Sequence, residues 1–295
     1  MTNDLPSIGV TLMATDRMMP PADLAREIES RGLDSLFLAE HSHIPASRKT
    51  VWPGSPPGKN IPLPDTYWHI NDQIVGLSMA AAVTERIELG TSVTLVPQHD
   101  PVWLAKQIAT LDHLSGGRVV LGVGFGWNEE QFAAHGADFK TRRARTEEAI
   151  AVMRALWTQE EASFDGEYFT LDPSWAYPKP KRPVPIIMGG GWGPVLFDAI
   201  TRYADGWMPI TARPTIADRA QPLRDRFEAA GRDPASVQIA ITGATEDPDG
   251  IIALGREGVQ RVLLTVWSED RDEILATLDR FATIAAQARG ETNPC

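Results

Sequence analysis

The chain has 295 residues, 43% of them hydrophobic and 23% charged, which is enough to bury the core of one enzyme-sized domain. Its formal net charge of -11 disfavours general binding to nucleic acid or to an anionic membrane. The chain contains no apolar run of about 18 residues, the length of a membrane span, and residues 1–7 lack the basic and apolar regions of a signal peptide. We therefore expect a cytoplasmic protein with no membrane partner. The one cysteine, Cys295, excludes an intrachain disulfide and a cysteine-based metal site.

Short apolar runs alternate with helical patterns from one end of the chain to the other. The apolar runs show little strict alternation with polar residues, which is typical of parallel strands that are covered on both faces. Strands are predicted at residues 8–13, 35–39, 87–94, 119–123, 185–188, 206–210, 237–242 and 261–267. Helices are predicted at residues 21–30, 72–83, 101–114, 142–157, 195–203, 216–230, 248–257 and 272–288.

Residues with strong positional preferences mark the ends of these helices. Asp100 and Asp247 each precede a proline, the arrangement of an N-cap followed by proline at the first helical position. Gly32, Gly206 and Gly258 stand where a helix gives way to the next strand. Eight strand–helix units without an antiparallel run predict a single domain, residues 1–295, folded as a (β/α)8 TIM barrel. An open, doubly wound sheet is the alternative, because such units can also lie open.

Two stretches interrupt the repeating pattern. Residues 42–70 follow the second predicted strand and contain six prolines together with Trp52, Tyr67 and Trp68, while residues 158–181 precede the fifth strand and are rich in aromatic residues. Long loops in a compact domain are usually lids or packed covers. We expect loop insertions at the C-terminal face of the barrel, where enzymes with this fold carry their active sites. For the first insertion, an oligomer contact or an inert surface loop is the alternative.

Two predicted strands end in backbone that carries almost no side chains. The strand at 119–123 runs into Gly122, Gly124 and Gly126, and the strand at 185–188 runs into three consecutive glycines at 189–191. Glycine at such a place lets a flat ligand or its phosphate approach the main chain, although tight strand-to-helix turns use glycine as well. The spacing matches neither the P-loop nor the dinucleotide fingerprint, which needs a glycine where Trp127 stands.

Five stretches of the chain resemble, in sequence and in order, the bacterial luciferase-like monooxygenases: residues 32–41, 84–93, 111–127, 164–169 and 185–191. Within that family they are similar to the branch that uses the 8-hydroxy-5-deazaflavin coenzyme F420. The resemblance implies an F420-dependent oxidoreductase that transfers a hydride between the reduced deazaflavin and a small organic substrate. It also implies a homodimer and a reductase that supplies the reduced cofactor. The alternative is an FMNH2-dependent two-component flavin monooxygenase of the same family, which would use FMN.

The resemblance assigns cofactor-binding roles to three groups of residues. Relatives carry a non-proline cis peptide against the flavin-type ring at the end of the third strand, which predicts a cis bond between Ser92 and Val93; an ordinary trans strand end is the alternative. The phosphate loop of the family, where backbone N–H groups at a helix start hold the anion, and the loop that lines the ring and ribityl chain are both matched. The ring loop corresponds to Gly124, Phe125, Gly126, Trp127 and Asn128, and the phosphate loop to Gly189, Gly190, Gly191 and Trp192.

His41 is the candidate catalytic residue, because it matches a position where F420-dependent relatives hold a histidine near the reactive edge of the ring. An imidazole titrates near neutral pH and can move the proton that accompanies hydride transfer. A histidine that only holds a loop through Glu40 is the alternative. The chain departs from the sugar-phosphate dehydrogenases of the family, with Pro45 in place of an aromatic residue and Trp127 in place of a glutamate. These departures argue against a sugar phosphate as the substrate.

Two other classes of protein remain as alternatives. The run Glu-His-Ser-His at residues 40–43 could belong to a barrel metallohydrolase, but all six histidines lie in the first half of the chain and no metal is expected. A barrel that binds a flavin without catalysis is the second, because fold alone does not confer activity. F420 also carries an oligoglutamate tail beyond its phosphate. The cations expected to receive this tail are Lys179, Lys181, Arg182 and Arg213.

Overall fold

The computed structural model describes residues 5–209 and 216–291. The strands are β1 (Ser7–Leu12), β2 (Ser35–Leu38), β3 (Glu88–Thr91), β4 (Val119–Val123), β5 (Ala162–Asp165), β6 (Thr170–Ser174), β7 (Ile186–Gly189), β8 (Gly206–Met208), β9 (Gln238–Thr242) and β10 (Arg261–Thr265). The α-helices are α1 (Pro21–Ser30), α2 (Thr66–His69), α3 (Gln73–Ala81), α4 (Pro101–Ser115), α5 (Glu129–Ala134), α6 (Arg142–Thr158), α7 (Pro194–Tyr203), α8 (Ile216–Ala229), α9 (Pro248–Arg256) and α10 (Arg271–Arg289). Two short 3-10 helices are η1 (Val96–Gln98) and η2 (Pro234–Ser236).

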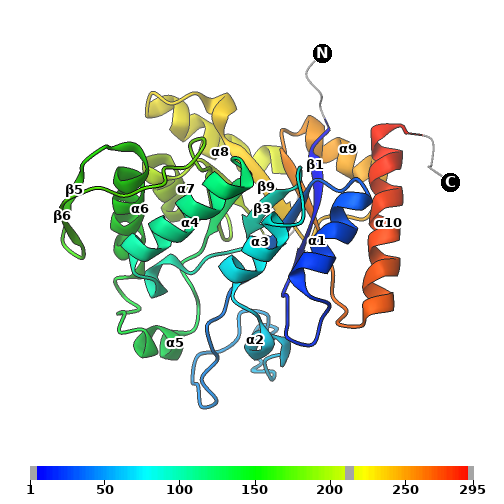
Figure 1. Cartoon of the computed structure of the whole chain (residues 1–295), viewed down its shortest axis with the longest axis horizontal. Helices are drawn as coiled ribbons and strands as arrows, with labels where there is room; N and C mark the ends of the chain where they lie inside the picture. Colours follow the sequence, from blue (N-terminus) through cyan, green and yellow to red (C-terminus); the bar gives the residue numbers. More distant parts are fainter. Residues whose placement is uncertain (1–4, 210–215, 292–295) are drawn as a thin grey trace.

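Eight of the strands form a closed parallel barrel in the order β1-β10-β9-β8-β7-β4-β3-β2. Strand β1 pairs in parallel with both β2 and β10, so the first and last strands of the chain complete the ring. The long helices lie outside it, and the carboxyl ends of the strands point to the lower edge of Figure 1, where α2 and α5 lie. The predicted (β/α)8 barrel is therefore confirmed, and the open sheet is excluded. Within the described ranges, no helix is long and apolar enough to cross a membrane.

The inside of the barrel is a packed core, as expected for this fold. Its side chains form a small cluster that is separate from the larger core between strands and helices. Phe37 fills much of the space, because the neighbouring strand leaves room for it: a Cβ on Gly90 would lie 2.2 Å from the Phe37 ring. A ligand site must consequently be sought at the ends of the barrel. The cluster consists of Phe37, Val120, Ile187, Met208, Ala240 and Leu263.

Most of the predicted helix boundaries follow from caps that the structure confirms. Asp100 Oδ1 accepts the backbone N–H of Trp103 at 2.9 Å, and α4 starts at the proline between them. Gly32, after α1, has a φ of +70°, which favours glycine. Gly206 is the first residue of β8, as predicted for a glycine between a helix and the next strand. A Cβ there would be 2.1 Å from the carbonyl oxygen of Gln238 on the next strand, so close strand contact also requires glycine.

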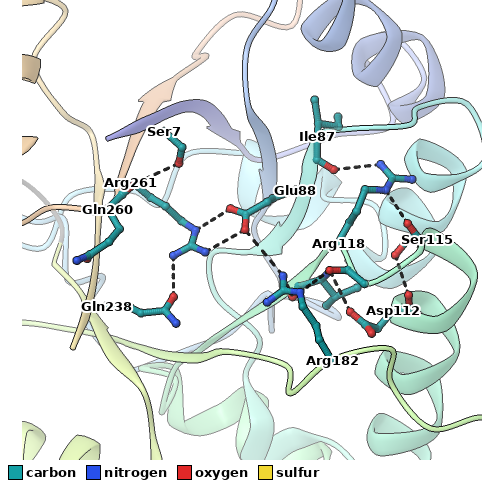
Figure 2. A network of polar contacts seen from close by, with 12 residues as sticks. Ser7, Ile87, Glu88, Asp112, Ser115, Arg118, Arg182, Gln238, Gln260 and Arg261 are labelled. Atoms are coloured by element: carbon teal, nitrogen blue, oxygen red, sulfur yellow. Dashed lines mark hydrogen bonds and ion pairs between the residues drawn. The ribbon is translucent and has the colours of Figure 1, made fainter. Parts of the chain in front are cut away.

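The amino-terminal end of the barrel is closed by a network of charged side chains (Figure 2). Arg261, the first residue of β10, is 8% exposed and donates to Glu88 of β3 through Nε at 2.7 Å and Nη2 at 3.0 Å. Its Nη1 donates to Oε1 of Gln238, the first residue of β9, at 2.8 Å. Beside this group, Arg118 donates to the carbonyl oxygens of Ser115, Ala81, Thr84 and Ile87.

The two insertions occupy different places. Residues 42–70 lie at the carboxyl ends of the strands, as predicted, and Ile70 forms a β-bridge with Thr15, which follows β1. Residues 158–181 lie elsewhere, which corrects the expectation of a second cover at that face. They form the antiparallel hairpin β5–β6 along the outside of α6 (Figure 1). Glu148 on α6 holds the hairpin turn, because its carboxylate accepts the backbone N–H groups of Glu167 and Tyr168 at 2.9 and 2.8 Å.

Candidate functional site

The segment after β3 brings the two glycine-rich strand ends together. The Ser92–Val93 peptide is cis, which confirms that expectation. The Val93 side chain lies between the ends of β4 and β7: a Cβ on Gly124 would be 2.4 Å from Val93 Cγ2, and a Cβ on Gly189 would be 2.8 Å from Val93 Cγ1. Packing around Val93 therefore requires both glycines, whether or not a ligand binds. The Ser92 hydroxyl lies 2.7 Å from the hydroxyl of Thr11 in β1.

The first glycine loop, residues 122–128, combines half-buried rings with a helix cap. Phe125 and Trp127 are half-buried, and Gly126 between them has a φ of +72°, which favours glycine. Asn128 is only 1% exposed and caps α5, because its Oδ1 accepts the backbone N–H of Gln131 at 3.2 Å. Its Nδ2 is buried and has no partner among the described residues, so its contact with a cofactor stays a prediction. The surface that this loop offers consists mainly of two aromatic rings and the backbone between them.

The second glycine loop, residues 189–193, leads into α7 and has open space beside it. A Cβ on Gly191 or Gly193 would meet no atom within 4 Å. Among the described residues no side chain caps α7, as is also true of α1, α2 and α6, whereas α3, α4, α5, α9 and α10 are each capped by an aspartate or asparagine. The first N–H groups of α7 can therefore receive an anion, as a phosphate loop requires. Gly190 is held from the other side, since its carbonyl oxygen accepts the Nε1–H of Trp207 at 2.9 Å.

His41 lies just beyond β2, close to the first glycine loop and the first insertion. Its Nδ1 is 3.0 Å from Oε1 of Gln131, and its ring centroid is 5.2 Å from that of Tyr67 and 6.0 Å from that of Trp127. Burial lowers the pKa of His41 below its ordinary value, and this effect exceeds the opposing effects of Gln131 and of the charge on Glu40. A neutral imidazole beside two aromatic rings can accept a proton and later return it.

Glu40 does not hold His41, contrary to the alternative considered from the sequence. Its Oε2 accepts the backbone N–H of Leu95, and its Oε1 lies 2.7 Å from Nε2 of His99. Burial alone would lower the pKa of His99, but the hydrogen bond and charge of Glu40 outweigh burial and leave that pKa raised. Glu40 therefore braces the segment that follows the cis peptide, and His41 is left with a neutral partner.

Gln131 was missed by the sequence analysis, although it connects His41 to two further histidines. Its side chain is fully buried, and its Nε2 donates to Oγ of Ser42 at 3.2 Å. Ser42 Oγ also lies 2.7 Å from Nε2 of His135 and 3.0 Å from Nδ1 of His43. Across residues 5–209 and 216–291, no three histidine, cysteine or acidic side chains form a group that could hold a metal ion.

The first insertion builds an aromatic wall next to His41. The ring of Tyr67 meets that of Trp127 edge-on, with centroids 6.3 Å apart, and the Tyr67 hydroxyl accepts the Nε1–H of Trp52 at 3.0 Å. The guanidinium of Arg48 lies 5.9 Å from the centroid of Trp127. The wall is mainly aromatic, so it shields one side of the imidazole from water.

Polar contacts hold this insertion at both ends. The Glu130 carboxylate, on α5, accepts the Thr50 hydroxyl at 2.6 Å and also the backbone N–H groups of Lys49 and Thr50. These bonds, that of the Thr50 hydroxyl first, lower the pKa of Glu130 to about 2. At the other end Arg17 pairs with Asp65 at 2.7 Å.

Three of the cations predicted to bind a coenzyme tail lie at the opposite end of the barrel. They precede β7 in the chain, and the whole length of that strand separates them from Gly189. Lys179 donates to the carbonyl oxygens of Leu156 and Gln159 at the end of α6, and Arg182 donates to that of Gly117. The predicted role in binding the coenzyme tail is therefore wrong for Lys179, Lys181 and Arg182. Arg213, the fourth predicted cation, lies outside the described residues.

Two other arginines lie beside the glycine loops. The guanidinium of Arg143, on α6, is 4.9 Å from the ring centroid of Phe125. That of Arg219, on α8, is 5.7 Å from the ring centroid of Trp192, whose side chain is 59% exposed. These two cations replace the ones predicted from the sequence as candidates for contact with an anionic ligand.

Comparison with known proteins places the chain in a family. A model of the luciferase-like monooxygenase family matches residues 8–246. The chain is 41% identical over 276 residues to an uncharacterized protein of Mycobacterium tuberculosis, covering 93% of this chain and 96% of that protein. It is 31% identical to the F420-dependent glucose-6-phosphate dehydrogenase of Kineococcus radiotolerans, over 75% of this chain and 61% of the dehydrogenase.

Solved structures share the fold at lower identity. An F420-dependent secondary alcohol dehydrogenase, in complex with an F420-acetone adduct, matches with a TM-score of 0.76 at 21% identity, covering 97% of this chain and 99% of that one. A monooxygenase from Streptomyces bottropensis matches with a TM-score of 0.74 at 20% identity, covering 96% and 99%. Barrel and sequence relatives together define an oxidoreductase of the TIM-barrel class. The chain belongs to the luciferase-like monooxygenase family.

Proposed function

We propose that the protein is an F420-dependent oxidoreductase that transfers a hydride between the deazaflavin and a small organic substrate. The observation that carries the proposal is the convergence of two glycine-rich strand ends on Val93, with open backbone at the start of α7 and a half-buried histidine at the same end of the barrel. Sequence relatives at 31% and 35% identity that are named F420-dependent glucose-6-phosphate dehydrogenases support the choice of coenzyme.

The residues of this chain fit such a coenzyme. The N–H groups at the start of α7, next to Gly191, would receive its phosphate, and Val93, Phe125 and Trp127 offer apolar surface to a flat ring. Arg143 would receive carboxylates of the tail, and Arg219 could do so from the other loop. When bound, the deazaflavin supplies a hydride donor or acceptor at C5, a carbon that reacts poorly with oxygen.

The protein contributes orientation, a proton site and exclusion of water. His41 takes the proton that leaves the substrate, or returns it in the reverse direction, because burial keeps its imidazole neutral. Tyr67 and Trp127 flank that imidazole, so the substrate is held under the insertion against an apolar wall. Such a wall suits a small apolar alcohol or carbonyl compound better than a sugar phosphate. The sequence agrees, because Pro45 and Trp127 stand where the sugar-phosphate dehydrogenases of the family carry an aromatic residue and a glutamate.

An FMNH2-dependent monooxygenase is the second candidate. The open start of α7 would suit the phosphate of FMN as well as that of F420. The fold is also shared with the oxygenating constituent of 3,6-diketocamphane monooxygenase, solved in complex with FMN, at a TM-score of 0.71 and 15% identity. The two coenzymes differ in the tail, which only F420 carries, so the tail is the feature to test.

Equilibrium binding of both coenzymes to the purified protein tests the proposal. We expect F420 to bind more tightly than FMN, and its affinity to fall with added salt, because exposed charges are screened over about 8 Å at physiological ionic strength. Arg143→Gln should weaken binding of F420 but not of a deazaflavin that lacks the tail, with Arg280→Gln, whose exposed ion pair with Glu246 lies elsewhere, as the control. Tight binding of FMN without measurable affinity for F420 would favour the monooxygenase.

The partners of the enzyme are proposals of the same kind. A homodimer has an apolar surface to form through, because Val75 and Met79 on α3 are 60% and 42% exposed and Trp103 and Leu114 on the adjacent α4 are 69% and 78% exposed. Sedimentation of the parent and of Trp103→Glu would test it, since a charge in that surface should shift a dimer to monomers. A reductase that regenerates the reduced coenzyme completes the proposed cycle.

A further inference from the structure

Gln131 makes a directional contact with His41. Its side-chain oxygen Oε1 lies 3.0 Å from His41 Nδ1, and its nitrogen Nε2 lies 3.2 Å from the hydroxyl of Ser42. An amide accepts hydrogen bonds only at its oxygen and donates only from its nitrogen. With Oε1 toward His41, the imidazole must donate, so its Nδ1 carries a hydrogen. Gln131 is fully buried, so water does not compete for these two contacts.

Ser42 is the partner of the amide nitrogen. A hydroxyl has one hydrogen to donate and two lone pairs to accept with. The Ser42 oxygen accepts from Gln131 Nε2, and it is also 2.7 Å from Nε2 of His135 and 3.0 Å from Nδ1 of His43. It can therefore donate to one of these two imidazoles and accept from the other. Both polar atoms of the Gln131 amide have a partner in this arrangement, with its oxygen toward His41 and its nitrogen toward Ser42.

We propose that Gln131 is a positioning residue that holds His41 in the tautomer with hydrogen on Nδ1, which leaves Nε2 as the nitrogen that exchanges a proton with the substrate. Among the described residues, Nδ1 is the nitrogen of His41 that has a hydrogen-bond partner. In substrate oxidation, Nε2 would take the hydroxyl proton of the substrate and become an imidazolium, while a bound deazaflavin would supply the acceptor for the hydride; reduction would return both to the substrate. The proton exchange at Nε2 rests on the proposed function, whereas the tautomer of His41 does not.

A neutral amide at this position has a consequence for charge. A carboxylate would attract the imidazolium and raise the pKa of His41, whereas an amide orients the ring without adding charge. The titratable groups near the ring are Glu40 and His43 on its own segment and Tyr67 on the insertion, with Arg48 beyond Trp127. Glu40 is engaged with His99. Substitution of Gln131 should therefore change both the tautomer and the titration of His41.

Nitrogen NMR of the protein labelled with [15N]histidine tests the tautomer without coenzyme or substrate. A protonated and a bare ring nitrogen resonate far apart, and couplings to the ring protons tell Nδ1 from Nε2; the His41→Asn variant assigns the signals. We expect hydrogen on Nδ1 in the parent and a mixture of tautomers in Gln131→Met, which keeps the shape but removes the acceptor. Hydrogen on Nε2 in the parent, or an unchanged single tautomer in Gln131→Met, would overturn the proposal.

Three variants separate a positioning role from a structural one. Gln131→Glu should raise the pKa of His41 by about 1 pH unit or more, because it places a negative charge on Nδ1–H. Ser42→Ala, at an exposed residue, should release the amide and give mixed tautomers even if Gln131→Met folds poorly. Gln98→Met, beside Gly126, is the matched control and should leave His41 unchanged. The signals of His99, which pairs with Glu40, report the fold in each variant. Failure of the parent to bind F420 would remove the proposed function but leave the tautomer result intact.

Discussion

The two ends of the barrel use polar side chains in opposite ways. At the amino-terminal end, Arg261 is almost fully buried and its donors are matched by Glu88 and Gln238 (Figure 2). At the carboxyl-terminal end, only one ring nitrogen of His41 has a hydrogen-bond partner among the described residues, and no described side chain caps the start of α7. The same eight strands thus carry a closed, saturated end and an end whose polar groups are open to a ligand.

This difference separates stability from function in a (β/α)8 barrel. Strand ends at the carboxyl side lead into loops that vary freely, while the amino-terminal side has to satisfy the polar groups where the strands begin. Substitutions at the saturated end should therefore lower the free energy of unfolding and leave coenzyme binding intact. Substitutions at the open end should weaken coenzyme binding or catalysis and leave the free energy of unfolding nearly unchanged.

The largest effect is expected for His41→Ala. Loss of a positioned acid or base costs about 10²–10⁴-fold in rate, whereas a half-buried residue at the barrel mouth contributes little to stability. We expect F420 affinity and melting temperature to stay near those of the parent. Because the pKa of His41 is lowered, its neutral form persists below its ordinary pKa, and the parent rate for substrate oxidation should fall only in more acidic solution. An identical pH–rate profile for parent and variant would contradict the proton-transfer role.

Arg261→Met should have the next largest effect, on stability alone. Removing one member of a mostly buried pair leaves Glu88, 28% exposed, and Gln238 without their donors, at a cost of about 2–3 kcal/mol of unfolding free energy. Urea unfolding measures the change, and F420 titration should show unchanged affinity. Arg280→Met is the matched control, because its ion pair with Glu246 is exposed on both sides, 52% and 45%, and should cost less than about 1 kcal/mol. Equal losses in the two variants would contradict the prediction.

The barrel was predictable because its signals are local. Apolar runs, N-caps such as Asp100 and turn glycines such as Gly32 lie within a few residues of the boundaries that they set. The hairpin β5–β6 was missed because its position depends on Glu148, which accepts the N–H of Glu167, 19 residues later. Gln131 was missed for the same reason, since its contact with His41 spans 90 residues.

One error in the site has an equally physical cause. Lys179 was placed near the phosphate loop because it is near Gly189 in sequence, but a strand between them carries the chain from one end of the barrel to the other. Asn128 has a second role that its sequence context also indicates, because asparagine before Glu-Glu-Gln is an N-cap pattern and its Oδ1 caps α5. The cofactor contacts themselves stay predictions, because they depend on a ligand rather than on the chain.

Gly191→Val tests the open end more cleanly than a substitution at Gly190. Gly190 has a φ of +147° and a Cβ there would be 3.2 Å from Leu196, so a valine would strain the backbone, whereas a Cβ on Gly191 would meet no atom within 4 Å. A valine at Gly191 should block approach to the start of α7 and lower F420 affinity about 10–100-fold, the equivalent of one or two hydrogen bonds to a charged group. Melting temperature should stay unchanged. Parent-like affinity in a folded Gly191→Val would refute the phosphate assignment.

The smallest effect is expected where the insertion is anchored to α5. The pKa of Glu130 is lowered from 4.5 to about 2 by the Thr50 hydroxyl and by backbone N–H groups, so its contribution is fully present above about pH 4.5 and is lost as the pH falls toward 2. Glu130 is only half-buried, so solvent screens its contacts and Glu130→Gln should cost no more than about 1 kcal/mol. The substitution should also loosen the insertion locally. Backbone N–H groups of Lys49 and Thr50 bind the carboxylate, so their hydrogen exchange should speed up in Glu130→Gln at pH 7. Glu129→Gln, one residue earlier on the helix, is the control and should leave that exchange unchanged. Equal protection of these two amides in Glu130→Gln and the parent would show that Glu130 does not hold the insertion. The ion pair of Arg17 with Asp65, at the other end, would then be the contact that holds it.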